Sequence, residues 1–308
     1  MKRKISVIGA GNVGASVAQY TAEANIADIV LVDIVEGMPQ GRALDLTEAG
    51  PVRGYNAMVV GTNDYAEIAG SELVVVTAGI ARKPGMSRED LLSTNAKIMG
   101  QVAENIKQHA PDAYVIVVSN PLDIMTYHAL KVTGFPKHRV VGQAGVLDAT
   151  RFKSFIAMEL DVAMTDVHAM VLGGHGDTMV PLPRFTTVSG VPISELIPAD
   201  RIDALVDRTR NGGGEIVKYL KTGSAYYAPA ASVVTMVKAM LLDEKKLLPA
   251  STLLEGEFGL KDLCIGVPVI LGGNGVDKVV ELTLTDDESA ALKKSADTYR
   301  EILGSLGY

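Results

Sequence analysis

Six short apolar segments, rich in valine and isoleucine, recur through the first half of the chain. They are residues 4–9, 28–33, 56–62, 72–79, 113–120 and 139–145. Nearly every position is apolar, rather than every second one, which is typical of parallel strands that are buried on both faces. Helical patterns separate several of the segments, as at residues 13–25 and 94–110. This alternation predicts an α/β fold with a doubly wound, six-stranded parallel sheet.

The pattern changes at about Asp148, where strand-like runs become rarer and cluster around residues 163–172. Helical spacing recurs in residues 149–159, 202–220, 228–242 and 286–303. We therefore predict two domains, with the parallel sheet in residues 1–146 and a mixed α+β substrate domain in residues 147–308. Because no Pro/Ser-rich linker or internal repeat separates them, we expect the two halves to pack closely.

A glycine-rich motif directly follows the first apolar segment. Its residues are Gly9, Ala10, Gly11, Asn12, Val13 and Gly14. Gly9 permits a tight turn, Gly11 lets the backbone approach a pyrophosphate, and Gly14 allows close packing of helix on strand. Because a strand precedes the motif and a helix follows it, we interpret it as the dinucleotide-binding turn of a Rossmann fold.

Asp33 stands 19 residues after Gly14, at the end of the second apolar segment. A carboxylate there can accept hydrogen bonds from the adenosine ribose and repels a 2′-phosphate, so NAD is favoured over NADP. Two other glycine clusters, residues 212–214 and 272–275, lack this context. No clear strand precedes the first, and the second lies between strand-like runs as a hairpin turn does, so we predict structural roles for both.

The composition narrows the range of partners and locations. Hydrophobic residues make up 47% of the 308 residues, and the net charge is -7 with scattered basic residues, so we expect an ordered protein without a nucleic-acid partner. The single cysteine, Cys264, argues against a disulfide framework and a cysteine-rich metal site, and for a reducing compartment. Gly9 interrupts any signal-peptide core, and no apolar run reaches the roughly 18 residues of a membrane span. We therefore expect a cytoplasmic protein with no membrane partner.

His175 is the strongest catalytic candidate among five histidines. Residues 173–177 read Gly-Gly-His-Gly-Asp, so the backbone is free on both sides and the ring can project into a cleft. The pKa of histidine suits the removal of a hydroxyl proton as a hydride leaves. Asp148 is the candidate partner of this ring, and Arg151 follows three residues later, so both can face one cleft. An N-cap with a local ion pair is the alternative interpretation of Asp148.

A basic loop follows the fourth apolar segment, at the sheet edge where α/β folds bind ligands. Residues 81–90 read Ala-Arg-Lys-Pro-Gly-Met-Ser-Arg-Glu-Asp. The proline and glycine suit a closing loop, and Ser87 with Asp90 indicates the cap of a following helix. Arg82 and Arg88 could then be carried over the nicotinamide, although a solvated basic loop is the simpler alternative.

These motifs resemble the malate/lactate dehydrogenase family over essentially the whole chain. The resemblance rests on the glycine motif with Asp33, the loop at residues 82–88, Ser119-Asn120-Pro121, residues 147–151 and residues 174–177. Within the family, the chain is most similar to the lactate-dehydrogenase-like malate dehydrogenases of bacteria. The resemblance implies a homotetramer, or a homodimer as in other members.

The resemblance also implies roles for individual residues. His175 with Asp148 would exchange the proton, Arg151 would grip the C1 carboxylate of the substrate, and Arg88 would polarise its C2 oxygen. Asn120 would contact substrate, and the residues implied to contact NAD besides the glycine motif and Asp33 are Asn95, Val118 and Asn120.

Arg82 occupies the position that discriminates between substrates in the resembled family. An arginine there implies pairing with the distal carboxylate of malate or oxaloacetate, whereas lactate dehydrogenases place a neutral glutamine there. We therefore expect NAD-dependent oxidation of malate, a reaction of the tricarboxylic acid cycle. The substrate-contacting threonine of the family has no clear equivalent near residues 224–226.

Three other functions stay open at this point. A dehydrogenase for L-lactate or another 2-hydroxy acid shares everything except the need for Arg82. An NAD-dependent glycosidase begins with a similar glycine motif, but it needs a Cys/His metal site, and Cys264 has no histidine near it in sequence. A non-catalytic NAD-binding protein would not need His175, Asp148 and the arginines.

Overall fold

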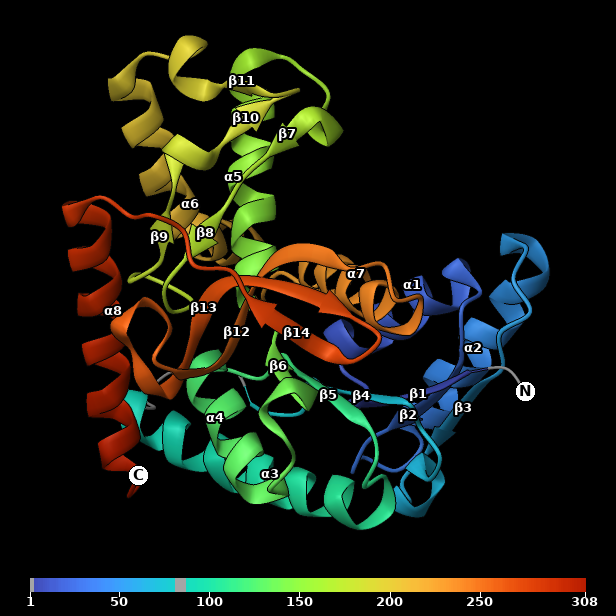
Figure 1. Ribbon diagram of the computed structural model, residues 1–308. Coiled ribbons are helices and arrows are strands. Elements are labelled where there is room, and N and C mark those ends of the chain that lie inside the picture. Colours follow the sequence, from blue (N-terminus) through green and yellow to red (C-terminus); the bar gives the residue numbers. More distant parts are fainter. Residues whose placement is uncertain (1–2, 81–86) are drawn as a thin grey trace.

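The computed structural model describes residues 3–80 and 87–308 (Figure 1). Parallel strands of the first half are β1 (Lys4–Ile8), β2 (Asp28–Val32), β3 (Val59–Thr62), β4 (Leu73–Val76), β5 (Tyr114–Val117) and β6 (Val140–Gly142). They lie in the order β3-β2-β1-β4-β5-β6, which is the order of a dinucleotide-binding sheet. The predicted doubly wound sheet is confirmed. β3, β5 and β6 are shorter than their apolar segments, because only part of each segment pairs with a neighbouring strand.

Helices cover both faces of this sheet. The connections between its strands contain α1 (Asn12–Ala24), α2 (Met38–Arg53), α3 (Arg88–His109) and α4 (Leu122–Thr133). Figure 1 shows α1 beside α7 (Tyr227–Leu241) on one face and α3 beside α4 on the other. The strands between these layers are shielded from water, and all four residues of β4 are 0% exposed. This double coverage explains why the strands are apolar at nearly every position.

The second half of the chain is a mixture of helices and short strands, as predicted. Its other helices are α5 (Ala144–Leu160), α6 (Ala199–Leu220) and α8 (Asp286–Ser305). Its strands are β7 (Val167–His168), β8 (Val171–Leu172), β9 (Val180–Pro181), β10 (Thr187–Val188), β11 (Val191–Pro192), β12 (Lys246–Glu255), β13 (Lys261–Gly272) and β14 (Gly275–Val279). Figure 1 shows β7, β10 and β11 with α5 and α6 in a lobe that projects from the large sheet.

The large sheet continues beyond β6 into the second half of the chain. β12, β13 and β14 extend it as antiparallel strands to nine strands in all among the described residues. The two halves join where Ser251 of β12 pairs with Gly142 of β6. The expected division between residues 146 and 147 falls within α5 and stays a prediction.

The two glycine clusters outside the first turn have the structural surroundings expected of them. Gly272 and Gly275 pair across the hairpin between β13 and β14, which confirms the predicted turn. Residues 212–214 lie inside the continuous helix α6. Neither cluster follows a strand and opens a helix, as a phosphate-binding turn does.

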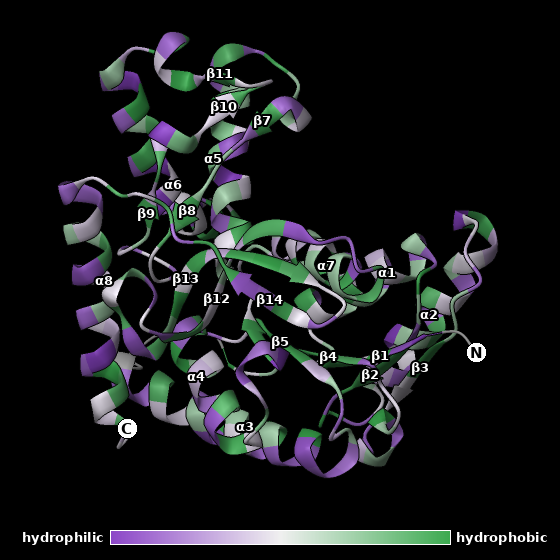
Figure 2. Cartoon of the chain, viewed as in Figure 1, coloured by the Kyte–Doolittle hydropathy of each residue, from purple (hydrophilic) through white to green (hydrophobic). Residues whose placement is uncertain are grey.

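Buried apolar side chains form one large core that includes both sides of the sheet and reaches from β1 to α8. A smaller cluster lies in the projecting lobe, where Phe152 and Ile156 of α5 pack near Leu205 of α6. Figure 2 shows apolar colouring concentrated on the central strands and α7, with mixed colouring along α3 and α8. No helix in the described segments is both long and apolar enough to cross a bilayer.

Candidate active site

The glycine turn between β1 and α1 has little room for side chains at two of its positions. Gly9 has a φ of +105°, and a Cβ on Gly14 would lie 1.8 Å from the carbonyl oxygen of Gly9. A Cβ on Gly11, in contrast, would meet nothing within 4 Å. No described side chain caps the start of α1, so its first backbone N–H groups are available to a phosphate.

Asp33 connects the end of β2 to this turn. Its Oδ2 accepts a hydrogen bond from the N–H of Ala10 at 2.6 Å, and its Oδ1 accepts one from the N–H of Val35 at 3.0 Å. A carboxylate oxygen can accept more than one hydrogen bond, so both oxygens keep capacity for ribose hydroxyls. Asn12 is exposed beside the turn, where its Oδ1 accepts from Nη2 of Arg42 at 3.2 Å. The turn and the carboxylate together fit the pyrophosphate and ribose of NAD.

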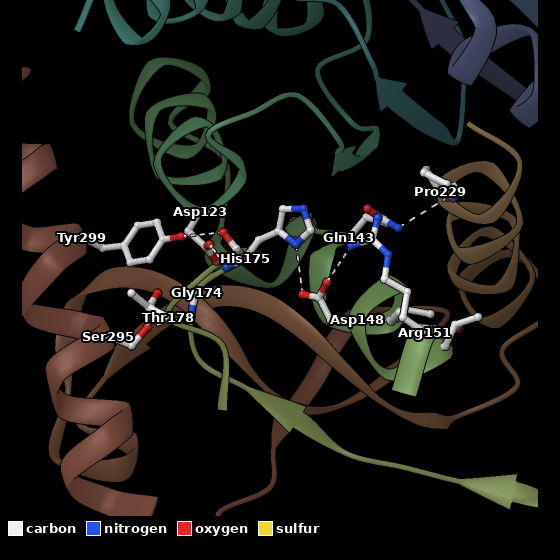
Figure 3. Close-up of polar contacts among 12 residues, drawn as sticks. Asp123, Gln143, Asp148, Arg151, Gly174, His175, Thr178, Pro229, Ser295 and Tyr299 are labelled. Carbon is white, nitrogen blue, oxygen red and sulfur yellow. Dashed lines mark hydrogen bonds and ion pairs between the residues drawn. The ribbon is translucent and has the colours of Figure 1, made fainter. Parts of the chain in front are cut away.

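His175 and Asp148 form a hydrogen-bonded pair (Figure 3). Nδ1 of His175, in the loop after β8, lies 3.0 Å from Oδ2 of Asp148 on α5. Asp148 is buried, with 2% of its surface exposed. Burial by itself lowers the pKa of His175, but the charge of Asp148 and its hydrogen bond outweigh that effect and raise the pKa above the usual value. With Nδ1 engaged, Nε2 is the nitrogen that can exchange a proton with a ligand.

Arg151 lies one turn of α5 beyond Asp148, with its side chain only 13% exposed. Its Nη1 is 3.5 Å from Oδ1 of Asp148, and its buried Nε has no hydrogen-bond partner in the described part of the chain. Burial lowers the pKa of Arg151, although an arginine stays charged at neutral pH. The guanidinium therefore keeps donors for a further anionic partner, and a carboxylate matches its geometry.

The glycines of α6 make room for this guanidinium. A Cβ on Gly212 would lie 3.1 Å from Cδ of Arg151, and one on Gly213 would lie 3.4 Å from its Nη2. The cluster that the sequence analysis set aside as structural therefore packs directly against a predicted substrate residue.

A cavity of about 370 Å³ lies between the glycine turn and the His175 loop. Five of the predicted site residues border it: Val13, Val118, Asn120, Arg151 and His175. Ser224 and Ala225, near which the family's threonine was expected, border it as well. Asp148 reaches the cavity through the His175 ring. The fold thus brings together predicted site residues that are up to 162 positions apart in sequence, from Val13 to His175.

Asn95 of α3 is buried, at 2% exposure, next to the segments that follow β4 and β5. Its Nδ2 donates to the carbonyl oxygens of Asn120 at 2.7 Å and Ile80 at 3.2 Å, and its Oδ1 accepts from the N–H of Ile80 at 2.9 Å. These three bonds tie together the chain after β4 and the chain after β5. The direct contact of Asn95 with NAD stays a prediction.

The structure describes different parts of the two loop arginines. Arg82 lies outside the described residues. Arg88 begins α3, but its side chain is outside the described part of the structure. The helix cap predicted from Ser87 and Asp90 is confirmed as a capping box. The Ser87 side chain accepts from the N–H of Asp90, and the Asp90 side chain accepts from the N–H of Ser87.

Three residues that the sequence analysis did not assign to the site hold the His175 loop. Oδ2 of Asp123 accepts from the N–H of His175 at 2.8 Å, Oγ of Ser295 accepts from the N–H of Gly174 at 2.9 Å, and Oη of Tyr299 donates to the carbonyl of His175 at 2.9 Å. Burial raises the pKa of Asp123. One signal was available, since Asp123 is an acid at the start of an otherwise apolar stretch, residues 122–125.

Backbone donors for a pyrophosphate and a paired histidine meet at one edge of the sheet, and this arrangement defines the class of NAD-dependent dehydrogenases. Residues 3–142 match the family model for the lactate/malate dehydrogenase NAD binding domain, and residues 145–305 match that for the lactate/malate dehydrogenase alpha/beta C-terminal domain. The chain belongs to the lactate/malate dehydrogenase family. Its cofactor is NAD, and no group of three or more His, Cys, Asp or Glu side chains in residues 3–80 and 87–308 is placed to hold a metal ion.

Individual relatives match over the full length. The chain is 61% identical over 306 residues to malate dehydrogenase of Thermomicrobium roseum, covering 99% of both chains. The structure of malate dehydrogenase from Salinibacter ruber has a TM-score of 0.95 and 51% identity, covering 99% of this chain and 97% of that one. Lactate dehydrogenase from Cryptosporidium parvum, complexed with lactic acid and nicotinamide adenine dinucleotide, has a TM-score of 0.96 and 45% identity, covering 100% and 98%. Because solved structures named malate dehydrogenase and lactate dehydrogenase share this fold, the fold alone does not decide the substrate.

Proposed function

We propose that the protein catalyses the reversible, NAD-dependent oxidation of (S)-malate to oxaloacetate. The observation that carries this proposal is the pairing of His175 with Asp148 in the same cavity as the partly unpaired guanidinium of Arg151. That arrangement suits an alcohol with a carboxylate beside it. The arginine at position 82 and the relatives named malate dehydrogenase favour a second carboxylate on the substrate.

The acid/base step follows from the geometry of the pair. When bound, the nicotinamide supplies the group that accepts or returns the hydride. In the oxidation, neutral His175 takes the C2 hydroxyl proton on Nε2, while Asp148 fixes the tautomer and stabilises the protonated ring. Malate oxidation therefore increases as the pH rises through the pKa of His175, and oxaloacetate reduction is lost over the same interval. Because Asp148 raises this pKa, both the rise of malate oxidation and the loss of oxaloacetate reduction occur at higher pH than an isolated histidine would give.

Three arginines would hold the dicarboxylate. Arg151 would bind the C1 carboxylate with two parallel hydrogen bonds, Arg88 would polarise the C2 oxygen, and Arg82 would pair with the distal carboxylate. Asn120, which borders the cavity, would contact substrate and cofactor. The remaining residues that we assign to NAD are Gly9, Ala10, Gly11, Asn12, Val13, Gly14, Asp33, Asn95 and Val118.

NADH oxidation by the purified protein tests the proposal, with oxaloacetate compared against pyruvate. We expect a strong preference for oxaloacetate that Arg82→Gln removes or inverts, because the distal carboxylate then loses its charge partner. The wild-type protein at matched NADH concentration is the control. A wild type that prefers pyruvate would leave the His175 chemistry intact but make it a dehydrogenase of lactate or another 2-hydroxy acid.

We further propose that the protein works in the cytoplasm, within the tricarboxylic acid cycle, as a homotetramer or homodimer. The lone cysteine, which is buried, fits a reducing compartment. Exposed apolar side chains on α2, Leu44 at 60% and Val52 at 88%, support self-association. Light scattering coupled to size-exclusion chromatography tests the oligomer, and a monomer at micromolar concentration would contradict it.

A further inference from the structure

Most of the hydrogen bonds that hold the loop around His175 are made by the backbone of the loop. Gly173 pairs with Gly266 of β13 through hydrogen bonds of 2.9 and 3.2 Å. Gly174 donates to Oγ of Ser295 at 2.9 Å, and Gly176 has a φ of +120°. Glycines on both sides of His175 leave its backbone few intrinsic restraints, so the orientation of the ring depends on external contacts.

Two contacts hold the backbone of His175 itself. Asp123 of α4 accepts from its N–H at 2.8 Å, and Tyr299 of α8 donates to its carbonyl oxygen at 2.9 Å. Figure 3 shows Tyr299 on the opposite side of His175 from Asp148 and Arg151. The peptide groups on the two sides of the His175 Cα are therefore fixed by different helices.

The fit of Tyr299 against this loop is tight. A Cβ on Gly174 would lie 1.8 Å from Cε2 of the Tyr299 ring and 2.7 Å from its Oη. Tyr299 is 7% exposed, and burial together with the nearby charge of Asp123 raises the pKa of its hydroxyl. The hydroxyl therefore keeps its proton, which it needs in order to donate to the His175 carbonyl.

α8 itself is anchored well away from the cavity. Thr285 and Glu288 form a capping box at its start, and Nη2 of Arg184 contacts Oε2 of Glu288 at 2.9 Å. Beyond its other end, Oη of Tyr308 lies 2.6 Å from Nδ1 of His128 on α4. A helix held at both ends is a rigid support for the one hydroxyl that it directs at the histidine.

We propose that Tyr299 is a positioning residue for the acid/base histidine, acting through the His175 carbonyl to keep Nδ1 within hydrogen-bond distance of Asp148. This proposal rests on the proposed function, in which His175 exchanges the proton. The charged and titratable groups around His175 are Asp148 and Arg151 on α5, Asp123 on α4 and Tyr299 on α8. Tyr299 acts on the ring through the His175 backbone, because its hydroxyl bonds the His175 carbonyl and also interacts with Asp123, which accepts from the His175 N–H.

The test is Tyr299→Phe, which keeps the ring and removes one hydroxyl. Loss of one hydrogen bond of ordinary strength should lower kcat for oxaloacetate reduction about five-fold. The KM for oxaloacetate should change little, because Arg151 is held by α5 and α6. A weaker contact with Asp148 lowers the pKa of His175, so the pH at which reduction is lost should move to lower values.

Tyr114→Phe is the matched control, because it removes the same hydroxyl from a tyrosine at the start of β5, whereas the cavity is bordered by Val118 and Asn120 beyond the other end of that strand. It should leave kcat and the pH profile unchanged. A second comparison places Tyr299→Phe in a His175→Asn background. If Tyr299 acts through His175, it should have no further effect on the residual activity there.

The outcomes separate the proposal from the function on which it rests. Full retention of kcat and of the pH midpoint in Tyr299→Phe would overturn the positioning role while leaving the His175 chemistry intact. An equal loss in the His175→Asn background would also overturn it, because the effect would then be one of general structure. Undiminished activity of His175→Asn alone would instead overturn the proposed acid/base function.

Discussion

The cofactor turn and the His175 loop both depend on glycine, but they use it in different ways. In the turn, Gly9 and Gly14 let one strand and one helix approach, and the contacts proposed for the cofactor are backbone N–H groups. In the loop, Gly174 and Gly176 leave the backbone free, and Asp123 and Tyr299 restrain it from two separate helices. One site is built within a single strand-turn-helix unit, and the other is assembled from distant elements.

Because of this difference, the two sites should be impaired by different kinds of substitution. A backbone site fails when a side chain intrudes on a close contact, and few other substitutions affect it. An assembled site can lose precision through residues that never touch the substrate, because its geometry depends on supporting hydrogen bonds. Substitutions in the two regions should therefore differ in which kinetic quantity they change.

The largest effect is expected from His175→Asn. Removing the proton acceptor should lower kcat by about 10³-fold, within the range for general acid–base groups. NADH binding should be retained, because the glycine turn lies on β1 and α1. Steady-state kinetics with a fluorescence titration of NADH measures both, and equal loss of both would contradict the independence of the two sites.

The cofactor turn can be broken with Gly14→Ala. The new Cβ would lie 1.8 Å from the Gly9 carbonyl, so the turn must distort, and we expect NADH to bind about 10- to 100-fold more weakly. Gly11→Ala is the matched variant, since its Cβ would meet nothing within 4 Å in the protein. Both variants can be compared by calorimetric titration and by thermal unfolding. We expect Gly11→Ala to retain the wild-type Tm, and a drop equal to that of Gly14→Ala would contradict the steric argument.

A smaller effect is expected from Asp123→Asn, and it should depend on pH. Burial raises the pKa of Asp123 in the folded chain, so the stability it contributes is complete below its unfolded value and is lost as the pH rises toward the folded value. The variant lacks this loss, so its free energy of unfolding relative to wild type should increase with pH. The pKa of His175 should fall at the same time, because the charge of Asp123 helps to raise it.

Urea unfolding of both proteins from about pH 4 to pH 8 measures this difference. Parallel stability curves for wild type and variant would show that Asp123 does not titrate in this interval. A moderate reduction of kcat is expected as well, since an amide can still accept from the His175 N–H.

The smallest effects should come from α6, where two glycines differ in their surroundings. Gly214 borders the cavity but has no neighbour within 4 Å of an added Cβ, so Gly214→Ala should stabilise the helix by about 0.5–1 kcal/mol and change KM less than Gly212→Ala does. Gly212→Ala would place its Cβ 3.1 Å from Arg151 Cδ, so it should displace the guanidinium and raise KM about three-fold. Thermal unfolding and substrate titration distinguish the pair. Identical KM values would show that Arg151 accommodates the methyl group.

The two regions also differ in how far the sequence predicts them. The glycine turn and Asp33 are close in sequence and follow a periodic strand, so their arrangement was predictable from spacing. The pairing of His175 with Asp148 was also predicted, from residue type and context. Tyr299 lies in residues 286–303, for which the sequence predicted only a helix, because spacing cannot show that one hydroxyl reaches a carbonyl 124 positions earlier.

The extension of the sheet was missed for a related physical reason. β12, β13 and β14 pair with one another in sequence order, but only the tertiary fold places β12 next to β6. Local patterns indicate strands, whereas the neighbour of an outer strand depends on how the rest of the chain packs.

The pairing of Ser251 with Gly142 also bears on how the chain unfolds. A fragment that ends after β6 would leave one edge of that strand without its neighbour, and unpaired N–H and C=O groups at a sheet edge promote aggregation. The core is likewise continuous from β1 to α8. We therefore expect thermal denaturation to be a single cooperative transition for both halves, and the first half expressed alone to self-associate.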